Sequence, residues 1–84
     1  MELHVNLEDG AALPAYSRED DAALDLRASE SCRIHAGRVR MVETGVRIAV
    51  PRGYAALVLP RSGMACRDMV TVINAPGLID PNYR

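Results

Sequence analysis

Residues 46–60 read VRIAVPRGYAALVLP, and this stretch decides the class of fold. In residues 46–50, valine and isoleucine alternate with arginine and alanine. A period of two places the branched side chains on one face of a β-strand. Pro51-Arg52-Gly53 predicts a turn. Residues 54–59 are more continuously apolar, which is typical of a strand covered on both faces, and Pro60 ends them. The stretch therefore predicts two strands joined by a turn.

Short alternating runs separated by turn residues continue in both directions from this stretch. They predict strands at residues 3–7, 24–28, 32–36, 39–50 (in two pieces), 54–59 and 70–73, with one helical turn at residues 64–69. No segment has a sustained 3.6-residue apolar period, and the chain has no internal repeat or linker. We expect a single all-β domain over residues 1–84, of the sandwich or barrel-like kind.

Size and charge limit what this domain does. A chain of 84 residues is one domain at most. At this size, folding removes only about 60–65% of the unfolded chain's surface from water, so stability is expected to be marginal. All ten basic residues are arginine, and the net charge of −1 argues against a general binder of nucleic acids or membrane surfaces.

The cysteines and histidines predict neither a disulfide framework nor a metal cage. Cys32 and Cys66 are far apart in the sequence, and the amino-terminal residues lack both a basic leader and an apolar run. Reduced thiols in a cytoplasmic protein are the favoured interpretation, with one disulfide as the alternative. His4 and His35 have no partner at metal-ligand spacing, so no metal site built from protein side chains alone is predicted.

Two polar insertions interrupt the apolar pattern before residue 70. Asp25 stands between two leucines, and an alternating strand would by itself explain it as a solvent-facing residue. Arg61-Ser62-Gly63 follows an apolar strand. There Gly63 would permit close approach of a ligand, successive N–H groups would form an anion nest, and Arg61 would add a cationic fork. An ordinary turn that ends a strand explains this tripeptide equally well.

The third insertion is residues 74–84, NAPGLIDPNYR, where an amide, a carboxylate and a phenol follow one another closely. If residues 70–73 and 78–79 are the two arms of a hairpin, Asn74 and Asp80 lie near its open end and face one cleft. A Pro-Gly hairpin with a solvated aspartate is the alternative.

Taken together, the three insertions resemble the motifs of the trimeric dUTPase family. Residues 22–28, AALDLRA, are similar to the first motif, residues 60–65, PRSGMA, to the second, and residues 74–84 to the third. The resemblance covers essentially the whole chain. It implies a dUTPase-like β-clip, a distorted jelly-roll that is incomplete at the carboxyl-terminal end, and a homotrimer in the full-length protein.

The resemblance also implies a reaction and residue roles. Family members hydrolyse dUTP to dUMP and pyrophosphate. Asp80 would activate the attacking water, a task that requires reach and a suitable pKa. Asn74 would read the uracil edge, since an amide offers a donor and an acceptor. Gly77 would let the backbone approach the base, and Tyr83 would exclude a 2′-hydroxyl.

The phosphate side of the implied site comes from the first two motifs. Arg61, Ser62 and Gly63 would hold the phosphates. Asp25 would bind waters of a Mg²⁺ ion carried by the triphosphate, because Mg²⁺ keeps several waters and is bound largely by substrate phosphates. Nucleic-acid and membrane partners are not expected.

Two departures from the family pattern affect these expectations. Ala23 stands where the family usually has glycine. The sequence ends at Arg84, within the third motif, whereas family members continue into further strands, a fourth motif and a glycine-rich arm that closes over the phosphates. We therefore expect a truncated piece of a longer enzyme that folds poorly in isolation and hydrolyses dUTP weakly or not at all.

Two other functions stay open at this point. The related dCTP deaminases share the fold, but their second motif usually has a second serine where this chain has Gly63. A non-catalytic module that binds or senses deoxyuridine nucleotides would keep the pocket without turnover.

Overall fold

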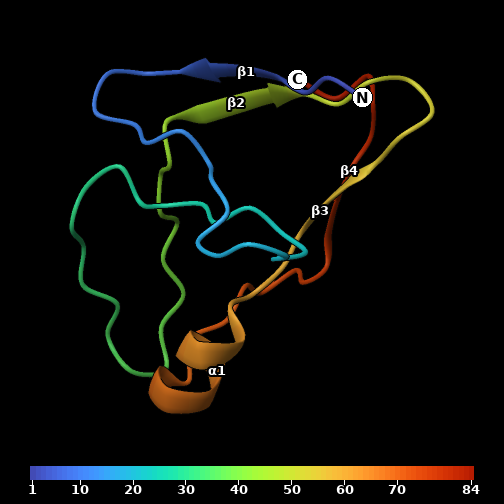
Figure 1. Ribbon diagram of the computed structural model, residues 1–84. Coiled ribbons are helices and arrows are strands. Elements are labelled where there is room, and N and C mark those ends of the chain that lie inside the picture. Colours follow the sequence, from blue (N-terminus) through green and yellow to red (C-terminus); the bar gives the residue numbers. More distant parts are fainter. The chain divides into compact units, whose positions relative to one another are not determined.

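A computed structural model describes residues 1–84. It contains β1 (His4–Leu7), β2 (Val46–Ala49), β3 (Ala56–Val58), α1 (Ser62–Asp68) and β4 (Gly77–Ile79), in that order (Figure 1). Strands and irregular segments predominate, and the single helix is short. This arrangement confirms the predicted all-β class. The chain forms two compact units, one of residues 1–4 and 48–84 and the other of residues 5–47. No helix is both long and apolar enough to cross a membrane.

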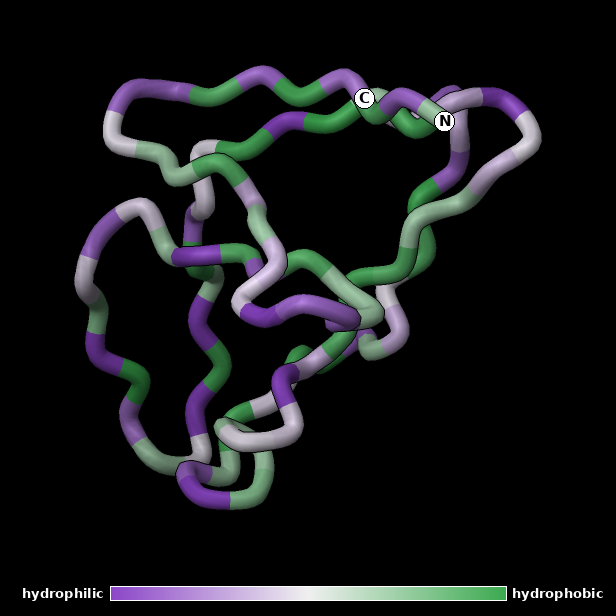
Figure 2. Tube along the Cα trace, viewed as in Figure 1, coloured by the Kyte–Doolittle hydropathy of each residue, from purple (hydrophilic) through white to green (hydrophobic).

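β1 and β2 form a two-stranded sheet whose strands run in opposite directions (Figure 1). Both alternate in hydropathy along the chain, as Figure 2 shows. In β2, Val46 and Ile48 are half-buried whereas Arg47 is exposed, as the period of two predicted. Val50, directly after β2, is 5% exposed and is the one hydrophobic residue that is fully buried. The alternation is therefore confirmed for residues 46–48, whereas Ala49, which was expected on the face of Arg47, is half-buried as well. The core at this strand is very small.

β3 and β4 form the second sheet, an antiparallel pair in which Leu57 lies opposite Leu78. The prediction that residues 54–59 are covered on both faces is wrong, because Leu57 is 56% exposed and Leu78 is 66% exposed. Side chains alternate between the faces of a strand, so these two leucines share one face. On the other face Ala56, Val58 and Ile79 are half-buried, and Gly77 is buried.

The predicted hairpin between residues 70–73 and 78–79 is also wrong. β4 pairs with β3, and residues 70–73 form no strand. The end of α1 explains the difference. Met69 has a left-handed backbone with φ of 56°, and its N–H donates to the Met64 carbonyl. The N–H of Val70 donates to the same carbonyl at 3.3 Å. The backbone N–H groups of Met69 and Val70 are therefore used by the helix cap and are not available to pair with a strand.

Three other predicted strands are shorter than expected or absent. Residues 24–28 contribute only an isolated antiparallel bridge between Asp25 and Ala15. Residues 32–36 and 39–45 form no strand. In the first of these, the Arg33 carbonyl accepts a hydrogen bond from the Arg40 guanidinium at 2.9 Å. Apolar alternation makes a segment compatible with a β-sheet. A strand forms only where the backbone of a neighbouring segment pairs with it.

Gly45 shows how closely the chain packs in the unit of residues 5–47. It has φ of +66°, and its carbonyl accepts the N–H of Glu8 at 2.8 Å. A Cβ added there would lie 2.8 Å from the Cβ of Ala11. Gly37 has a similar φ of +74° but nothing within 4 Å of an added Cβ. The two glycines therefore share the backbone conformation and differ in the space around them.

We expect Gly45→Ala to destabilise the protein more than Gly37→Ala does. Both variants place a side chain in the left-handed region, at a cost of about 1–2 kcal/mol. Only Gly45→Ala also overpacks its surroundings, which adds about 1–3 kcal/mol. Urea unfolding followed by circular dichroism measures the difference. Equal losses in the two variants would show that steric contact at Gly45 contributes nothing.

Candidate functional site

Asp80 lies at an open pocket of about 640 Å³, in the unit formed by residues 1–4 and 48–84. The pocket is lined by Arg52, Gly53, Asp80, Pro81, Asn82 and Arg84. Its volume is within the range of about 300–1,000 Å³ that is common for small-molecule sites. The lining brings together one carboxylate, one amide and two guanidinium groups.

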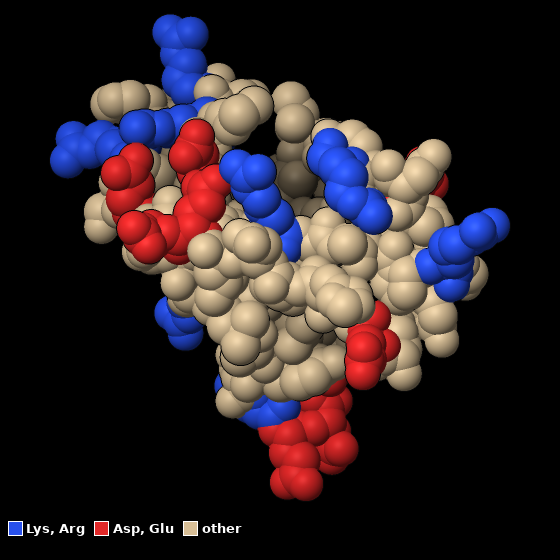
Figure 3. Space-filling view, turned by 90° about the horizontal axis from the view of Figure 1, so that it is seen from above, with Lys and Arg blue, Asp and Glu red and all other residues tan.

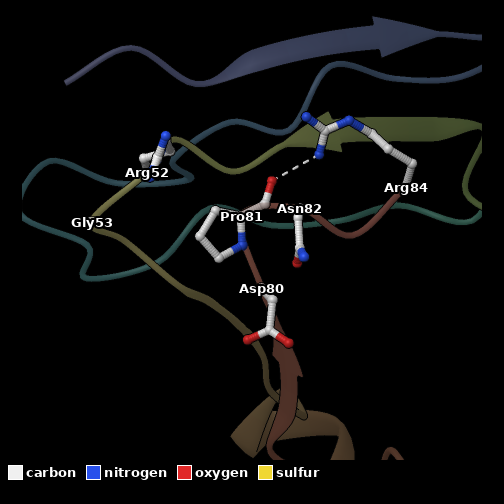
Figure 4. Close-up of a pocket in the computed structure, with 6 residues that line it drawn as sticks. All are labelled: Arg52, Gly53, Asp80, Pro81, Asn82 and Arg84. Atoms are coloured by element: carbon white, nitrogen blue, oxygen red, sulfur yellow. Dashed lines mark hydrogen bonds between the residues drawn. The ribbon is translucent and has the colours of Figure 1, made fainter.

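Two segments hold this pocket. Asp80 follows β4 directly, and Figure 4 shows its side chain at the end of that strand, with Asn82 and Pro81 above it. Arg52 and Gly53 come from the turn before β3. The exposed Asp80 carboxylate makes no hydrogen bond or ion pair within the chain. It is therefore available to a water molecule or a ligand.

The segment after Asp80 is folded into a turn by backbone contacts. The N–H of Tyr83 donates to the Asp80 carbonyl at 3.2 Å. The Arg84 guanidinium folds back and donates from Nη1 to the carbonyls of Pro81 at 2.9 Å and Tyr83 at 2.7 Å (Figure 4). These contacts fix the backbone on both sides of Asn82, so the pocket wall is a defined turn.

Asn74 and Gly77 are brought together, but not with Asp80. A Cβ added to Gly77 would lie 3.3 Å from Nδ2 of Asn74 and 3.5 Å from the Cβ of Val58. The Asn74 amide therefore rests on the glycine backbone, which itself lies against β3. Neither residue lines the pocket of Asp80. The reason is that β4 pairs with β3 and not with residues 70–73.

Tyr83 is 66% exposed, and it is not among the residues that line the pocket. Its phenol forms no hydrogen bond within the chain. The amide, carboxylate and phenol all lie in one unit and in one eleven-residue segment, but of the three only Asp80 lines the pocket.

Arg61, Ser62 and Gly63 form the start of α1 and not an isolated turn. Arg61 is the N-cap residue, and its carbonyl accepts the N–H of Ala65 at 2.9 Å. The helix begins at Ser62, two residues before the predicted helical turn at 64–69. Ser62 and Gly63 therefore occupy the first turn, where N–H groups have no partner within the helix. All three residues are exposed.

Asp25 lies in the unit of residues 5–47. Its N–H donates to the Ala15 carbonyl at 2.9 Å, and its Oδ2 accepts a hydrogen bond from the Ser17 hydroxyl. Asp25 is half-buried, whereas Leu24 and Leu26 are 40% and 44% exposed. The simple alternation, which would make Asp25 the solvent-facing residue, is therefore wrong at this position.

No group of three or more His, Cys, Asp or Glu side chains is arranged to hold a metal ion. Asp25 is therefore not part of a cluster of three or more such side chains, and it offers a carboxylate donor. Such a donor suits a hydrated Mg²⁺ ion whose other ligands come from a bound phosphate.

Two residues near the predicted positions were not expected from the sequence. Arg52 lines the pocket of Asp80, and Ser17 contacts Asp25. Arg52 sits in a stretch that reads as an ordinary turn, and Ser17 sits in a loop, so no periodicity marks either of them. The face seen in Figure 3 carries both basic and acidic side chains among uncharged surface.

Comparison with known proteins gives the chain a family. The family model described as dUTPase matches residues 9–84. A deoxyuridine 5′-triphosphate nucleotidohydrolase of Streptomyces avermitilis is 51% identical over 86% of this chain and 41% of its own length. Relatives with the same name in Mycobacterium avium and Leifsonia xyli are 45% and 49% identical, over 95% and 86% of this chain and 52% and 47% of their own lengths.

The chain thus spans about half the length of the curated relatives that it matches. The matched residues 9–84 include all three polar segments, with Asp25, the Arg61 cap of α1 and the pocket of Asp80. The chain belongs to the dUTPase family.

Proposed function

We propose that this chain carries the nucleotide site of a dUTP diphosphatase, which hydrolyses dUTP to dUMP and pyrophosphate. The observation that carries the proposal is the family match over residues 9–84, within which Asp80 presents an unpaired carboxylate at a pocket lined by two arginines. The names of the relatives, deoxyuridine 5′-triphosphate nucleotidohydrolase, indicate the substrate.

In this proposal Asp80 orients and deprotonates the attacking water. The water oxygen forms a bond to phosphorus, the bond between the α-phosphate and the pyrophosphate group breaks, and the proton passes to the Asp80 carboxylate. A positioned general base contributes about 10²–10⁴-fold to such a step. The exposed carboxylate, with no partner in the chain, is able to take this proton.

The other motif residues bind the nucleotide. Arg61, Ser62 and Gly63 hold phosphate oxygens at the first turn of α1, where backbone N–H groups point outward. Asn74, resting on Gly77, reads the uracil edge, and Tyr83 packs under the deoxyribose. Arg61, Ser62, Gly63, Asn74 and Tyr83 are exposed, whereas Gly77 is buried.

Asp25 is proposed to contact a Mg²⁺ ion through its bound waters. The ion, when bound with the triphosphate, neutralises phosphate charge and so favours attack by water. A carboxylate donor at Asp25 fits this outer contact, since no group of three or more His, Cys, Asp or Glu side chains forms a site built by the protein alone.

A cytoplasmic location is proposed for the enzyme, because its substrate is a nucleotide and both cysteines are free and exposed. Exposed free thiols are typical of reducing compartments. We also propose that the 84 residues by themselves turn over dUTP slowly, because Val50 is their single buried hydrophobic residue.

Release of pyrophosphate from dUTP, UTP and dCTP by the purified chain tests the activity. Selective release from dUTP is expected, and ammonia release from dCTP would instead identify a deaminase. Because turnover is expected to be slow, binding of dUMP and of α,β-imido-dUTP is followed in parallel by NMR. Binding without any turnover would favour the non-catalytic module, and absence of both would contradict the proposal.

A homotrimer is proposed for the full-length protein, and the exposed leucine face of β3 and β4 is the surface that subunit contact would cover. Leu57 and Leu78 lie opposite each other there and are more than half exposed. We expect Leu78→Ser to weaken self-association about 10- to 150-fold, since loss of a buried leucine side chain removes about 1.5–3 kcal/mol.

Sedimentation equilibrium measures this association. The matched control is Leu13→Ser, because Leu13 is 63% exposed in a loop outside the β3–β4 sheet. Equal effects of the two substitutions, or a wild-type chain that stays monomeric at all concentrations, would count against a subunit contact on this face.

A further inference from the structure

Ser17 and Asp25 are joined both through the backbone and through their side chains. Asp25 pairs with Ala15 in an antiparallel bridge, and the Asp25 N–H donates to the Ala15 carbonyl at 2.9 Å. Ser17 is two residues further along from Ala15. Ser17 lies in the bend that follows the bridged residue Ala15, close enough for its side chain to reach Asp25. The Ser17 hydroxyl indeed donates to Oδ2 of Asp25.

The loop between the two residues is closed by its own hydrogen bonds. The N–H of Arg18 donates to Oδ2 of Asp21 at 2.8 Å, and the N–H of Asp21 donates to the Arg18 carbonyl at 3.3 Å. Asp20, between them, adopts a left-handed backbone with φ of 68°. An aspartate that accepts a nearby backbone N–H stabilises such turns. The turn therefore brings the chain back so that Ser17 lies beside Asp25.

We propose that Ser17 is a positioning residue for Asp25, whose carboxylate it holds in one orientation by a hydrogen bond from its hydroxyl. The inference rests on the proposed function, in which Asp25 contacts the waters of a phosphate-bound Mg²⁺ ion. A carboxylate that contacts a cation through water depends on its orientation, and partners that hydrogen-bond to such a carboxylate set that orientation.

Ser17 does not touch substrate in this scheme and acts through Asp25 alone. A hydroxyl bond to a charged oxygen is stronger than a bond between neutral groups, which makes it a sufficient restraint for a half-buried side chain. Removal of the hydroxyl leaves the backbone bridge at Ala15 in place, because that bond uses only main-chain atoms. The expected effect is therefore loss of orientation without loss of the fold.

The test compares wild type, Ser17→Ala, Ser17→Thr and Ser29→Ala. Ser29 is the matched control, since its hydroxyl also forms one hydrogen bond within residues 5–47, to the Glu43 carbonyl at 3.1 Å, and does not contact Asp25. The first measurement is the set of three-bond NMR couplings that report the χ1 torsion of Asp25, taken without ligand. The second is binding of Mn²⁺ with α,β-imido-dUTP, followed by water-proton relaxation.

Ser17→Ala is expected to average the Asp25 couplings over several rotamers and to weaken binding of the Mn²⁺–nucleotide about tenfold, the lower end of what second-shell partners contribute. Ser17→Thr restores both, and Ser29→Ala changes neither. Unchanged couplings in Ser17→Ala, or averaged couplings with unchanged Mn²⁺–nucleotide binding, would overturn the positioning role. A wild-type protein with a single Asp25 rotamer that binds no nucleotide would instead refute the proposed function and, with it, this role.

Discussion

Asp80→Asn is expected to lower the turnover of dUTP by about 10²–10⁴-fold, the contribution of a positioned general base. Affinity for α,β-imido-dUTP should stay close to that of the wild type, because asparagine has nearly the same shape as aspartate and cannot accept the proton. A loss confined to the chemical step lowers the maximal rate and leaves ground-state binding unchanged.

The structure indicates that Asp80→Asn changes the side chain without disturbing its surroundings. The Asp80 carboxylate is exposed and has no partner in the chain, so its replacement breaks no hydrogen bond or ion pair. The turn that carries it is held by backbone groups, including the Asp80 carbonyl, which accepts the Tyr83 N–H. The conformation of the segment therefore does not depend on the charge of the side chain.

Single-turnover measurement of pyrophosphate release, with binding measured separately, checks this expectation. Asp68→Asn is the matched control, because Asp68 is an exposed aspartate at the end of α1 in the same unit. A rate for Asp80→Asn within a few-fold of the control would exclude Asp80 as the base. A parallel loss of affinity would assign it to nucleotide binding instead.

Strands were predicted correctly from the sequence where an apolar period of two coincides with a neighbouring strand that pairs with the segment. Residues 46–50 show this, because β2 has β1 beside it and Val50 is buried. Residues 32–36 show the opposite, since their alternation is no weaker but no strand pairs with them. Periodicity depends on the segment alone, whereas a strand depends on a partner that lies elsewhere in the sequence.

The candidate site was predictable as a set of residues but not as an arrangement. The motifs indicated Asp25, Arg61 and Asp80, and the family match covers all three. The pairing of β4 with β3 could not be predicted from the sequence, because the apolar residues 70–73 lie closer to β4 in the sequence and are the expected partner. Arg52 was missed because it lines the pocket together with residues of the segment 80–84, which is remote in sequence. Ser17 was missed because its contact with Asp25 depends on a turn that no periodicity marks.

Loss of the Asn74 amide is the second large effect that we expect. Asn74→Ala should weaken binding of dUMP about 10- to 100-fold, since one or two hydrogen bonds to the base contribute about 0.5–1.5 kcal/mol each and an unpaired buried group costs more. The preference for dUMP over dCMP should fall as well, because an amide that is held in one orientation distinguishes a carbonyl edge from an amino edge.

Gly77→Ala tests how that amide is held. An added Cβ would meet Asn74 Nδ2 at 3.3 Å on one side and the Val58 Cβ at 3.5 Å on the other. Val58 belongs to β3 and is paired with Gly77 in the sheet, so it is the less able of the two to move. The amide should therefore shift, and Gly77→Ala should reproduce much of the Asn74→Ala loss although Asn74 is still present.

The double variant separates this coupling from two independent effects. If Gly77→Ala acts through Asn74, then adding it to Asn74→Ala should weaken dUMP binding little further, which is the non-additive result expected for residues in contact. Asn82→Ala is the control, because Asn82 is the other exposed amide of the segment and lines the pocket of Asp80 instead. Isothermal titration with dUMP and dCMP measures all four proteins against wild type. Additive losses would show that Gly77 contributes to base binding through its own backbone and not through Asn74. If Asn82→Ala weakens binding as much as Asn74→Ala does, the uracil is bound in the pocket of Asp80 instead.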